Sequence, residues 1–405
     1  MICRKYIRTY PGELVDIIRS FIPSRYTEKD ICLFEERFAQ YVGRRHAVAV
    51  CSGRKGFELI LAALGIGAGD EVIFPAYTLK DLVTLVKKAG SIPVLVDIHE
   101  KNFNINPALI ERAITPRTKA IIATHLFGSP CDIKEIVASA HKRRLLVIED
   151  CAHSLGASID GAQTGSFGDA AFFSFELTKP INTFGGGMVV TDRADVAEWI
   201  RQKTMGLRFP QAALYKKIGF AYLERFIEKT IFFDILAAAF YFPTTTKILS
   251  ILYRFLQHRG RISNYRYSSA QAFLGLRQLE RLAEANRLRA EKARLLLENL
   301  DAAVEPQAIR KGVVPNFYFF VICFNAPVSS EELRKSFFIK GIDVGIKSEI
   351  ADDCTSALPY SLYMPVTSKI YSRSILLPLH EGLTEGAVKI IADTCNRIIM
   401  GIRKV

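Results

Sequence analysis

The sequence lacks the long hydrophobic runs of an integral membrane protein. No stretch of about 18 uncharged apolar residues occurs, so we predict no ordinary membrane-spanning helix. Residues 1–10 are basic but have no apolar core segment, and we therefore expect no signal peptide. Internal repeats and low-complexity segments are also missing, which argues against a solenoid or a disordered chain.

Cysteine is present but lacks the spacings of metal and redox sites. None of the eight cysteines belongs to a CxxC pair or to a Cys/His pattern typical of zinc sites. Several lie inside apolar runs, as Cys323 does between Ile322 and Phe324. We therefore expect reduced core cysteines in a cytosolic protein, and we predict no metal site.

The composition is that of a globular protein with a large core, since 49% of the 405 residues are hydrophobic and 23% are charged. There are 54 lysines and arginines against 41 aspartates and glutamates, which gives a net charge of +13. This charge favours anionic partners such as phosphates, nucleotides, acidic lipids or nucleic acid, but a solvated basic surface explains it equally well. Because no known DNA- or RNA-binding motif accompanies the charge, we predict no nucleic-acid partner.

The first half of the chain alternates between short β-rich runs and amphipathic stretches. An opening helix is predicted from Thr27, whose capping box uses Asp30, to Gly43. The predicted strands that follow are Ala47–Cys51, Glu71–Phe74, Pro93–Asp97, Ala120–Thr124, Leu145–Glu149, Ala171–Phe175 and Met188–Thr191. The helices predicted between the early strands are Phe57–Leu64, Leu79–Ala89, Pro107–Ala113 and Ile133–His141. This order predicts an α/β fold with a mostly parallel sheet, covered on both faces, whose ligands bind at the carboxyl ends of the strands.

The second half of the chain has a different pattern. Residues 206–260 are rich in aromatic and aliphatic side chains with scattered lysine and arginine, and residues 269–300 are predicted to form one long helix. A small α+β domain is predicted at the end of the chain, with a strand at Phe317–Phe324 and a closing helix at Glu385–Ile399. We therefore expect three parts: a large domain (1–205), an apolar and basic helical insertion (206–260), and a linking helix with the small C-terminal domain (261–405).

Two polar clusters follow predicted strands early in the chain. Ser52-Gly53-Arg54-Lys55-Gly56 lies between a strand and a helix, where glycines and a helix N-terminus can receive a phosphate. It lacks the Walker and full GxGxxG spacings, so in isolation a plain turn is the better explanation.

Asp150 ends a buried strand, where a carboxylate needs a cation such as a protonated pyridine nitrogen. Ala152 lies on the same face and could pack on a ring. The alternative role for Asp150 is a helix N-cap.

Two further clusters occur later in the chain. Lys179 follows an apolar strand and precedes Gly185-Gly186-Gly187, and a lysine amine in a desolvated site can attack an aldehyde. An ordinary surface lysine is the alternative. Ser263-Asn264-Tyr265-Arg266-Tyr267 offers polar donors among aromatic rings, which could contact a phosphate or a partner chain but could equally form a solvated loop.

Taken in this order and spacing, the clusters resemble the DegT/DnrJ/EryC1/StrS family of sugar aminotransferases, which depend on pyridoxal phosphate (PLP). The resemblance covers about residues 27–205 and 260–400. Its motifs are Gly69-Asp70-Glu71-Val72-Ile73 with Pro75 and Thr78, His125-Leu126-Phe127-Gly128, Glu149-Asp150-Cys151-Ala152-His153, Ser174-Phe175 with Lys179, Asn264-Tyr265-Arg266, Gly275-Leu276-Arg277-Gln278-Leu279 and Leu376-Leu377-Pro378-Leu379. One such motif is weak, whereas the ordered set is specific. The resemblance implies the fold type I, aspartate-aminotransferase-like, architecture for the large domain.

The resemblance also implies a role for each residue around the PLP ring. Lys179 would form a Schiff base with PLP and serve as the general acid–base. Asp150 would pair with the pyridine nitrogen and keep it protonated, which makes the ring an electron sink. Ala152 would pack on the ring face, and His153 would hydrogen-bond to the ring hydroxyl.

The phosphate group of PLP would be held by a separate set of residues. The resemblance assigns this task to Gly53, Arg54 and Ser174, and assigns to Asn264 a contact with the phosphate of the other subunit in a homodimer. The family usually has threonine where this chain has Arg54, so an altered phosphate grip is expected. The family also usually has an aromatic residue where this chain has Leu79. A leucine side chain can still pack on the PLP ring, but the entrance for the substrate is expected to differ.

The implied reaction is transamination. An amino acid, usually glutamate in this family, leaves its nitrogen on PLP, and a ketone carbon of a nucleotide-linked sugar then receives it, in cell-surface glycan or related amino-sugar biosynthesis. Family members that dehydrate a keto-sugar carry histidine in place of Lys179, so its presence argues against a dehydratase or lyase. The intact set of Lys179, Asp150 and Ser174 argues against a non-catalytic regulatory homologue.

Residues 206–260 form a longer segment than most family members carry at this place. Their amphipathic, aromatic and basic character is compatible with contact to an anionic membrane surface, which would place a cytoplasmic enzyme at the inner face of the membrane. The alternative is a helical lid or dimer contact whose apolar face is buried in protein.

Overall fold

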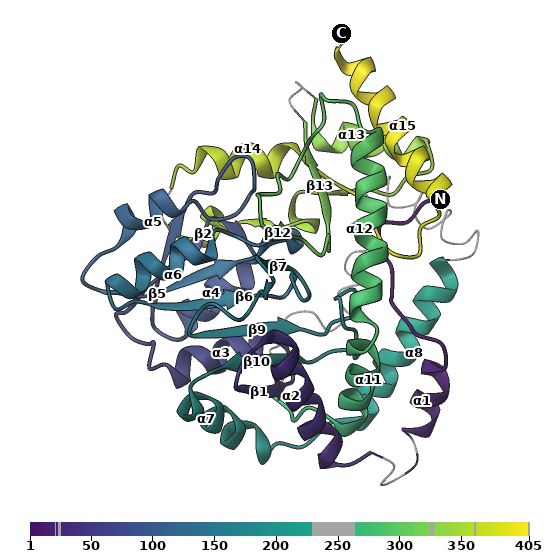
Figure 1. Ribbon diagram of the computed structural model, residues 1–405. Coiled ribbons are helices and arrows are strands. Elements are labelled where there is room, and N and C mark those ends of the chain that lie inside the picture. The colour runs from purple at the N-terminus through teal and green to yellow at the C-terminus, as the bar shows by residue number, and fades with distance from the viewer. Residues whose placement is uncertain (21, 23–25, 229–263, 325–327, 360–361, 404–405) are drawn as a thin grey trace.

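A seven-stranded sheet forms the centre of the computed structural model, which describes residues 1–20, 22, 26–228, 264–324, 328–359 and 362–403 (Figure 1). Its strand order is β1-β10-β9-β6-β5-β2-β4. The strands are β1 (His46–Val50), β2 (Glu71–Pro75), β4 (Ile92–Val96), β5 (Thr118–Thr124), β6 (Leu146–Asp150), β9 (Ala170–Ser174) and β10 (Gly187–Thr191). Neighbouring strands are parallel except that β10 runs antiparallel to β1 and β9. The predicted α/β fold with a mostly parallel sheet is confirmed.

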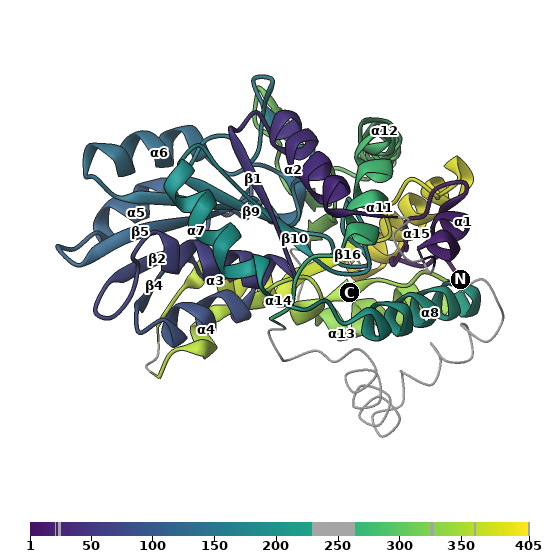
Figure 2. The same ribbon diagram turned by 90° about the horizontal axis from the view of Figure 1, so that it is seen from below.

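Helices cover both faces of this sheet, which explains why its strands are apolar on both sides. The helices on one face are α3 (Gly53–Ala63), α4 (Lys80–Lys88) and α7 (Ala194–Met205). Those on the other face are α2 (Glu28–Val42), α5 (Pro107–Ala113) and α6 (Ile133–Lys142). Figure 2 shows α2 and α6 above the sheet and α3 and α4 below it. The predicted cap of α2 is present, because the N–H of Thr27 donates to Asp30 at 2.6 Å and Gly43 ends the helix with φ 84°.

A second, smaller sheet lies in the C-terminal part of the chain. It is antiparallel, with the order β11-β13-β16-β14. Its strands are β11 (Glu305–Pro306), β13 (Phe320–Cys323), β14 (Gly345–Ile346) and β16 (Ser374–Leu377). The helices that share a core with it are α12 (Leu282–Asn299), α13 (Ser330–Ile339) and α15 (Glu385–Arg403). The predicted smaller α+β part is therefore also confirmed.

Two sequence-based boundaries in this part were wrong. The single helix predicted over residues 269–300 is two helices, α11 (Ser269–Leu279) and α12, because α11 packs on α2 at the large sheet while α12 packs on α15 at the small one. The strand predicted over Phe317–Phe324 begins only at Phe320. Phe317 has a φ of 50°, a left-handed conformation that cannot continue a strand.

The other elements lie outside these two sheets. They are α1 (Glu13–Arg19), α8 (Gln211–Glu228), α14 (Pro365–Arg373), β3 (Tyr77–Thr78), β7 (Ser158–Ile159), β8 (Ala162–Gln163), β12 (Val313–Val314), β15 (Asp352–Asp353), η1 (Leu126–Gly128), η2 (Lys347–Glu349) and η3 (Cys354–Ala357). β3 pairs with β15, and β12 pairs with β7, so each pair joins the large-sheet region to the C-terminal part. The first residues of the chain also lie along the C-terminal part, where Ile2 pairs with Ile342.

The structure describes residues 206–228 of the predicted insertion 206–260, which include helix α8, since residues 229–263 lie outside the described residues. Its buried side chains Leu214, Ile218 and Ala221 share a core with Phe184. In the part that the structure describes, the apolar inner face of the insertion is therefore buried in protein, while Leu223 and Phe226 are exposed (54% and 68%).

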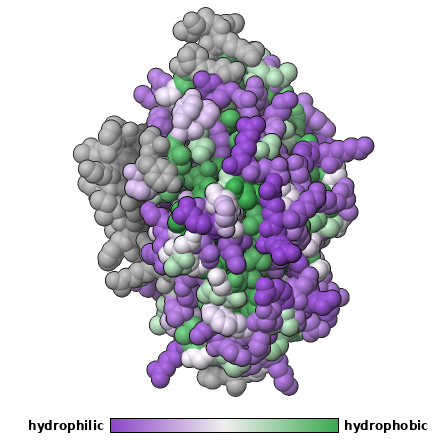
Figure 3. All heavy atoms as spheres, turned by 90° about the vertical axis from the view of Figure 1, so that its left-hand side faces the viewer, coloured by the Kyte–Doolittle hydropathy of each residue, from purple (hydrophilic) through white to green (hydrophobic). Residues whose placement is uncertain are grey.

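Among the described residues, no helix is both long enough and apolar enough to cross a membrane. The face on the α5 side of the molecule is mainly hydrophilic, with hydrophobic side chains gathered toward its middle (Figure 3). All eight cysteines are present as thiols, and six of them are buried.

Candidate active site

Residues from distant parts of the sequence meet at the carboxyl edge of the large sheet. Asp150 is the last residue of β6, and Ser174 is the last residue of β9. Gly53 follows β1, which runs in the same direction as β9 because both are antiparallel to β10. Lys179 follows β9 after a turn in which its N–H donates to the carbonyl of Glu176 at 2.9 Å. Ligands of open α/β sheets bind at this edge, so the predicted residues occupy the expected place.

Close backbone packing shapes the turn before α3. Ser52 is the N-cap of this helix and accepts a hydrogen bond from the N–H of Lys55 at 3.1 Å. A Cβ atom on Gly53 would lie 3.1 Å from the Cβ of Ser174, so the helix N-terminus and the serine are in direct contact. A helix N-terminus beside a hydroxyl group is suited to a phosphate, because N–H groups and the helix dipole both favour an anion.

Gly187 is the glycine whose replacement is expected to disturb this turn most. A Cβ atom there would lie 2.4 Å from the carbonyl oxygen of Phe173 and 2.7 Å from the backbone nitrogen of Gly53. Because both neighbours are backbone atoms, we expect Gly187→Ala to raise the dissociation constant for PLP by about tenfold or more. Gly206→Ala is the control, since no atom lies within 4 Å of its added Cβ. Equal PLP affinity of the two variants, measured by titration of the apo-protein, would contradict the prediction.

Asp150 is a buried carboxylate with capacity for a further donor. Within the described part of the chain, its side chain accepts one hydrogen bond, from the N–H of Ala152 at 3.0 Å. Burial raises the pKa of Asp150 above its usual range, while the positive charge of Lys179 opposes this rise. A cationic ring nitrogen would supply both the missing donor and the missing charge.

Lys179 and His153 both contact Tyr318. The Nζ atom of Lys179 lies 4.7 Å from the centroid of the Tyr318 ring. The His153 ring stacks on the same tyrosine, with 4.5 Å between the His153 and Tyr318 centroids and 25° between the planes. Burial lowers the pKa of His153 well below its usual range, and the charge of Lys179 lowers it further. His153 is therefore a neutral imidazole that can exchange a hydrogen bond with a ring hydroxyl.

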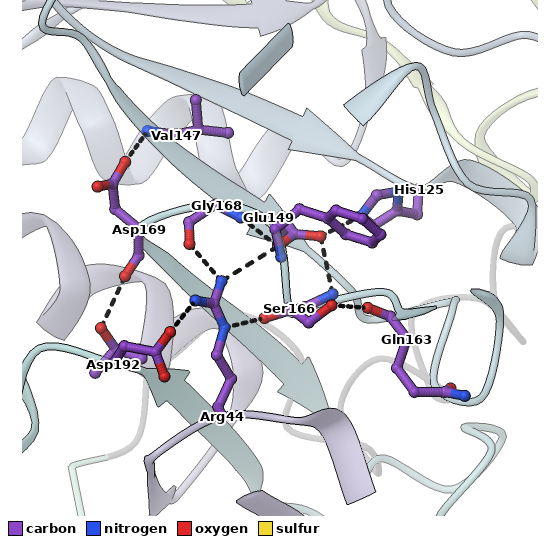
Figure 4. Close-up of polar contacts among 12 residues, drawn as sticks. Arg44, His125, Val147, Glu149, Gln163, Ser166, Gly168, Asp169 and Asp192 are labelled. Carbon is purple, nitrogen blue, oxygen red and sulfur yellow. Dashed lines mark hydrogen bonds and ion pairs between the residues drawn. The ribbon is translucent and has the colours of Figure 1, made fainter. Parts of the chain in front are cut away.

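Glu149, next to Asp150, is the centre of a buried polar network (Figure 4). Its two oxygens accept four hydrogen bonds of 2.7–2.9 Å, from His125 Nε2 and from the backbone N–H groups of Gly165, Phe167 and Gly168. The Nη2 atom of Arg44 also lies 3.8 Å from the Oε1 atom of Glu149. Burial opposes the charge of Glu149, but these donors outweigh it and hold the pKa of the carboxyl below its usual range.

His125, Glu149 and Cys151 come close enough to suggest a metal site, since their potential ligand atoms lie within 4.8 Å of one another. The Nδ1 atom of His125 accepts a hydrogen bond from the N–H of Cys131 at 3.2 Å, so Nε2 carries the proton that it donates to Glu149. Both imidazole nitrogens and both carboxylate oxygens are engaged, and we therefore describe the group as a hydrogen-bonded cluster.

The sequence profile of the DegT/DnrJ/EryC1/StrS aminotransferase family matches residues 23–396 of this chain. The chain belongs to this family. GDP-perosamine synthase of Escherichia coli O157:H7 is 29% identical over 403 residues, which cover 96% of this chain and 94% of that protein. The UDP-N-acetyl-3-dehydro-alpha-D-glucosamine 3-aminotransferase of Acidithiobacillus ferrooxidans is 46% identical over 175 residues, which cover 43% of this chain and 46% of that protein.

Solved structures agree with the family assignment. The aminotransferase TlmJ of Streptoalloteichus hindustanus has a TM-score of 0.80 at 21% identity, and the comparison covers 100% of both chains. DesV of S. venezuelae has a TM-score of 0.75 at 26% identity, covering 95% of this chain and 93% of that chain. The Spr1654 protein of Streptococcus pneumoniae in its PLP form has a TM-score of 0.76 at 22% identity, covering 98% of each chain. This chain therefore has the fold of type I PLP-dependent aminotransferases, and PLP is its cofactor.

The described residues fit PLP at this edge of the sheet. The fit rests on three features of this DegT/DnrJ/EryC1/StrS aminotransferase. They are the amine of Lys179, the buried carboxylate of Asp150, which accepts one hydrogen bond among the described residues, and the helix N-terminus packed against Ser174. Ala152 is half-buried next to Asp150, where its predicted contact with the ring face stays a prediction.

Three other residues were predicted to contact the cofactor: Arg54, Leu79 and Asn264. Arg54 forms an ion pair with Asp81 at 2.6 Å, so its charge is shared with the first turn of α4. Leu79, the N-cap of α4, is 46% exposed. Asn264 is exposed, and its contact with a second subunit stays a prediction. Its neighbour Tyr265 lies near the phosphate turn of its own chain, because its hydroxyl donates to the carbonyl of Cys51 at 3.3 Å.

Two residues that shape the site were not singled out as site residues by the sequence analysis. Tyr318 contacts both Lys179 and His153 but lies in the C-terminal part, within a segment that we predicted to be a plain strand. Gln278 holds the turn after Lys179, because its side chain exchanges two hydrogen bonds of 2.7 Å with the backbone of Asn182. Gln278 lies in one of the family-like motifs, which was the available signal, whereas no local pattern marks Tyr318.

A buried carboxylate supports Gln278 from the far side. Glu13 of α1 accepts hydrogen bonds from Gln278 at 3.2 Å and from the hydroxyl of Tyr222 on α8 at 3.0 Å. Burial raises the pKa of Glu13 to about 7, against the lowering effect of these two bonds. Helices α1 and α8 are thereby linked to the turn that follows Lys179.

The raised pKa of Glu13 predicts a pH-dependent stability. A carboxyl group with a higher pKa in the folded state than in the unfolded state destabilises the fold as pH rises through that interval. As the pH rises from 4.5 to 7.5, wild type should lose up to about 3 kcal/mol of unfolding free energy through ionisation of Glu13. The Glu13→Gln variant, which resembles the protonated form, should not lose this amount, so its stability relative to wild type should increase with pH. Denaturant unfolding at the two pH values tests this, with the exposed Glu36→Gln as control. A pH-independent difference between Glu13→Gln and wild type would refute it.

Proposed function

We propose that this enzyme transfers an amino group from an amino acid, with glutamate as the expected donor, to the ketone carbon of a nucleotide-linked sugar. The product would be an amino sugar for cell-surface glycan or related biosynthesis. The family membership establishes a PLP-dependent sugar aminotransferase. The similarity to GDP-perosamine synthase over nearly the whole chain supports a nucleotide-linked substrate. The observation that carries the site assignment is the meeting of Lys179, Asp150 and the α3 N-terminus at one edge of the sheet.

The proposed roles follow from the chemistry of each side chain. When bound, PLP supplies an aldehyde that takes up the amino group and a ring that withdraws electrons. Asp150 would hold a proton on the ring nitrogen, since its buried carboxylate needs a cationic partner. Lys179 would carry a proton on Nζ to and from the substrate carbon. Gly53 and Ser174 would hold the phosphate at the helix N-terminus, with Arg54 beside it.

A half-reaction tests this proposal without knowledge of the sugar. The PLP-loaded enzyme is mixed with glutamate alone, and 2-oxoglutarate is quantified together with the visible spectrum. We expect about one equivalent of 2-oxoglutarate per active site, because the amino group remains on the enzyme until an acceptor arrives. Failure of glutamate and of every other amino acid in a panel to give its oxo acid would overturn the transaminase assignment.

The acceptor is then identified by mass. Enzyme treated with glutamate is incubated with nucleotide-linked keto-sugars that differ in nucleotide and in ketone position. Transamination replaces the ketone oxygen by an amine, whereas the alternative dehydratase reaction removes water without adding nitrogen. A water loss without nitrogen gain would favour the dehydratase alternative.

We further propose that the enzyme acts as a homodimer in the cytoplasm. The exposed position of Asn264 supports its predicted reach to a second subunit, and the eight cysteine thiols suit a reducing compartment. Three functional parts are proposed: a PLP-binding part (1–205), the insertion (206–260) and a C-terminal part (261–405).

Peripheral membrane contact through 206–260 stays a prediction. Flotation with anionic liposomes tests it when wild type is compared with a Leu223→Asp, Phe226→Asp double variant.

A further inference from the structure

We propose that Tyr318 is a positioning residue for Lys179, whose free amine rests on the Tyr318 ring. The inference rests on the proposed role of Lys179. The 4.7 Å between Nζ and the ring centroid is within the range over which a cation is attracted to an aromatic face. The same tyrosine reaches the neighbouring residue, because its hydroxyl lies 3.2 Å from the Oγ1 of Thr178.

The Tyr318 ring is held from several sides. It is only 8% exposed. Its ring stacks with His153 at 4.5 Å and with Phe319 at 4.3 Å between centroids. A ring with these contacts cannot turn away without disrupting its neighbours, so it offers the lysine amine one fixed surface.

The backbone of Tyr318 is fixed by a side chain that also holds His153. The N–H of Tyr318 donates to Oδ1 of Asn316 at 2.9 Å. The amide nitrogen of Asn316 donates in turn to the carbonyls of His153 at 2.9 Å and of Leu155 at 3.0 Å. Gly128 makes room for this arrangement, since a Cβ atom there would lie 1.9 Å from Oδ1 of Asn316. Tyr318 is thus attached to the same turn that follows Asp150.

The chemistry of the site gives this arrangement a purpose. A Schiff-base lysine is released during each half-reaction and must then carry a proton as a free amine. Asp150 is the carboxylate whose pKa this charge affects, and an ammonium group that paired with it would occupy the place of the ring nitrogen. Among the described residues, Lys179 forms no ion pair within 4 Å. The Tyr318 face provides a different resting place for the amine, which would leave Asp150 available to the ring nitrogen.

Labelling of the apo-protein tests this inference independently of the reaction. Lysines are methylated reductively with formaldehyde and a borohydride, and the labelling rate of each lysine is followed by peptide mass spectrometry. Loss of the ring removes both the attraction for the cation and the steric cover of Nζ. We therefore expect Lys179 in Tyr318→Leu to be labelled about tenfold faster than in wild type. Tyr318→Phe keeps the ring and should stay within about threefold of wild type.

The controls separate positioning from unfolding and from failure of the proposed function. The exposed Lys119 serves as the internal standard, and its labelling rate should be equal in all proteins. Tyr318→Gln provides a second ring-free variant if Tyr318→Leu does not fold, and circular dichroism checks both. Equal labelling of Lys179 in wild type, Tyr318→Phe and a folded ring-free variant would overturn the inference. A negative glutamate half-reaction would instead overturn the proposed function while leaving the labelling result intact.

Discussion

Lys179→Ala is expected to reduce turnover at least about 1,000-fold and to remove the visible absorption of lysine-bound PLP. The effect is large because one amine performs two tasks, the covalent attachment of the cofactor and the proton transfer at the substrate carbon, and the substitution removes both. Binding of PLP should weaken but persist, because Asp150, Gly53 and Ser174 remain. Steady-state turnover with glutamate and an accepted keto-sugar, together with the absorption spectrum, measures both effects.

Two matched variants show whether the chemistry or the charge of Lys179 matters. Lys179→Arg keeps a positive charge near Asp150 and the Tyr318 ring but cannot form the imine, so it should be as inactive as the alanine variant. Lys119→Ala removes an exposed lysine on β5 and should retain wild-type turnover. Substantial activity in Lys179→Arg would show that charge alone suffices, and it would exclude the proposed role of the amine.

The large sheet could be predicted from the sequence because its signals are local. Every predicted strand of the first half corresponds to a strand of the sheet, with ends that differ by at most two residues. Buried parallel strands give continuous apolar runs, and helices between them give a clear period. Several of the family-like motifs likewise lie at strand ends, so the sequence predicts Asp150, Ser174 and Lys179 at one edge of the sheet.

The C-terminal part was less predictable because tertiary contacts decide its local structure. The break between α11 and α12 depends on which of two cores each helix meets, and a continuous helical period does not reveal it. The irregular stretch before β13 depends on Phe317 in a left-handed conformation and on side-chain bonds of Asn316. Tyr318 therefore reaches Lys179 through a fold that brings separate segments together. No spacing in the sequence encodes that contact.

Glu149 is another residue whose importance emerges only in three dimensions. The sequence placed it in a motif beside Asp150 without giving it a role. In the structure it has no exposed surface and ties the end of β6 to the loop that contains Gly165, Phe167 and Gly168. Arg44 reinforces the same loop, because it donates at 2.8 Å to the carbonyl of Gly165 (Figure 4).

Glu149→Gln is therefore expected to lower the free energy of unfolding by about 3–5 kcal/mol, the cost of breaking a buried ionic cluster. Each carboxylate oxygen accepts two N–H donors, so the NH₂ group of glutamine must face donors whichever way the amide turns. Denaturant unfolding of the apo-protein measures the loss, and Glu135→Gln on the exposed side of α6 is the matched control. A loss below about 1 kcal/mol would mean that the loop relaxes to accommodate the amide. In that case Glu149 would not be what fixes the end of β6, and PLP affinity should then equal that of wild type. If the large loss is found, PLP affinity should fall with it, because the peptide that carries Asp150 is held by the residue immediately before it.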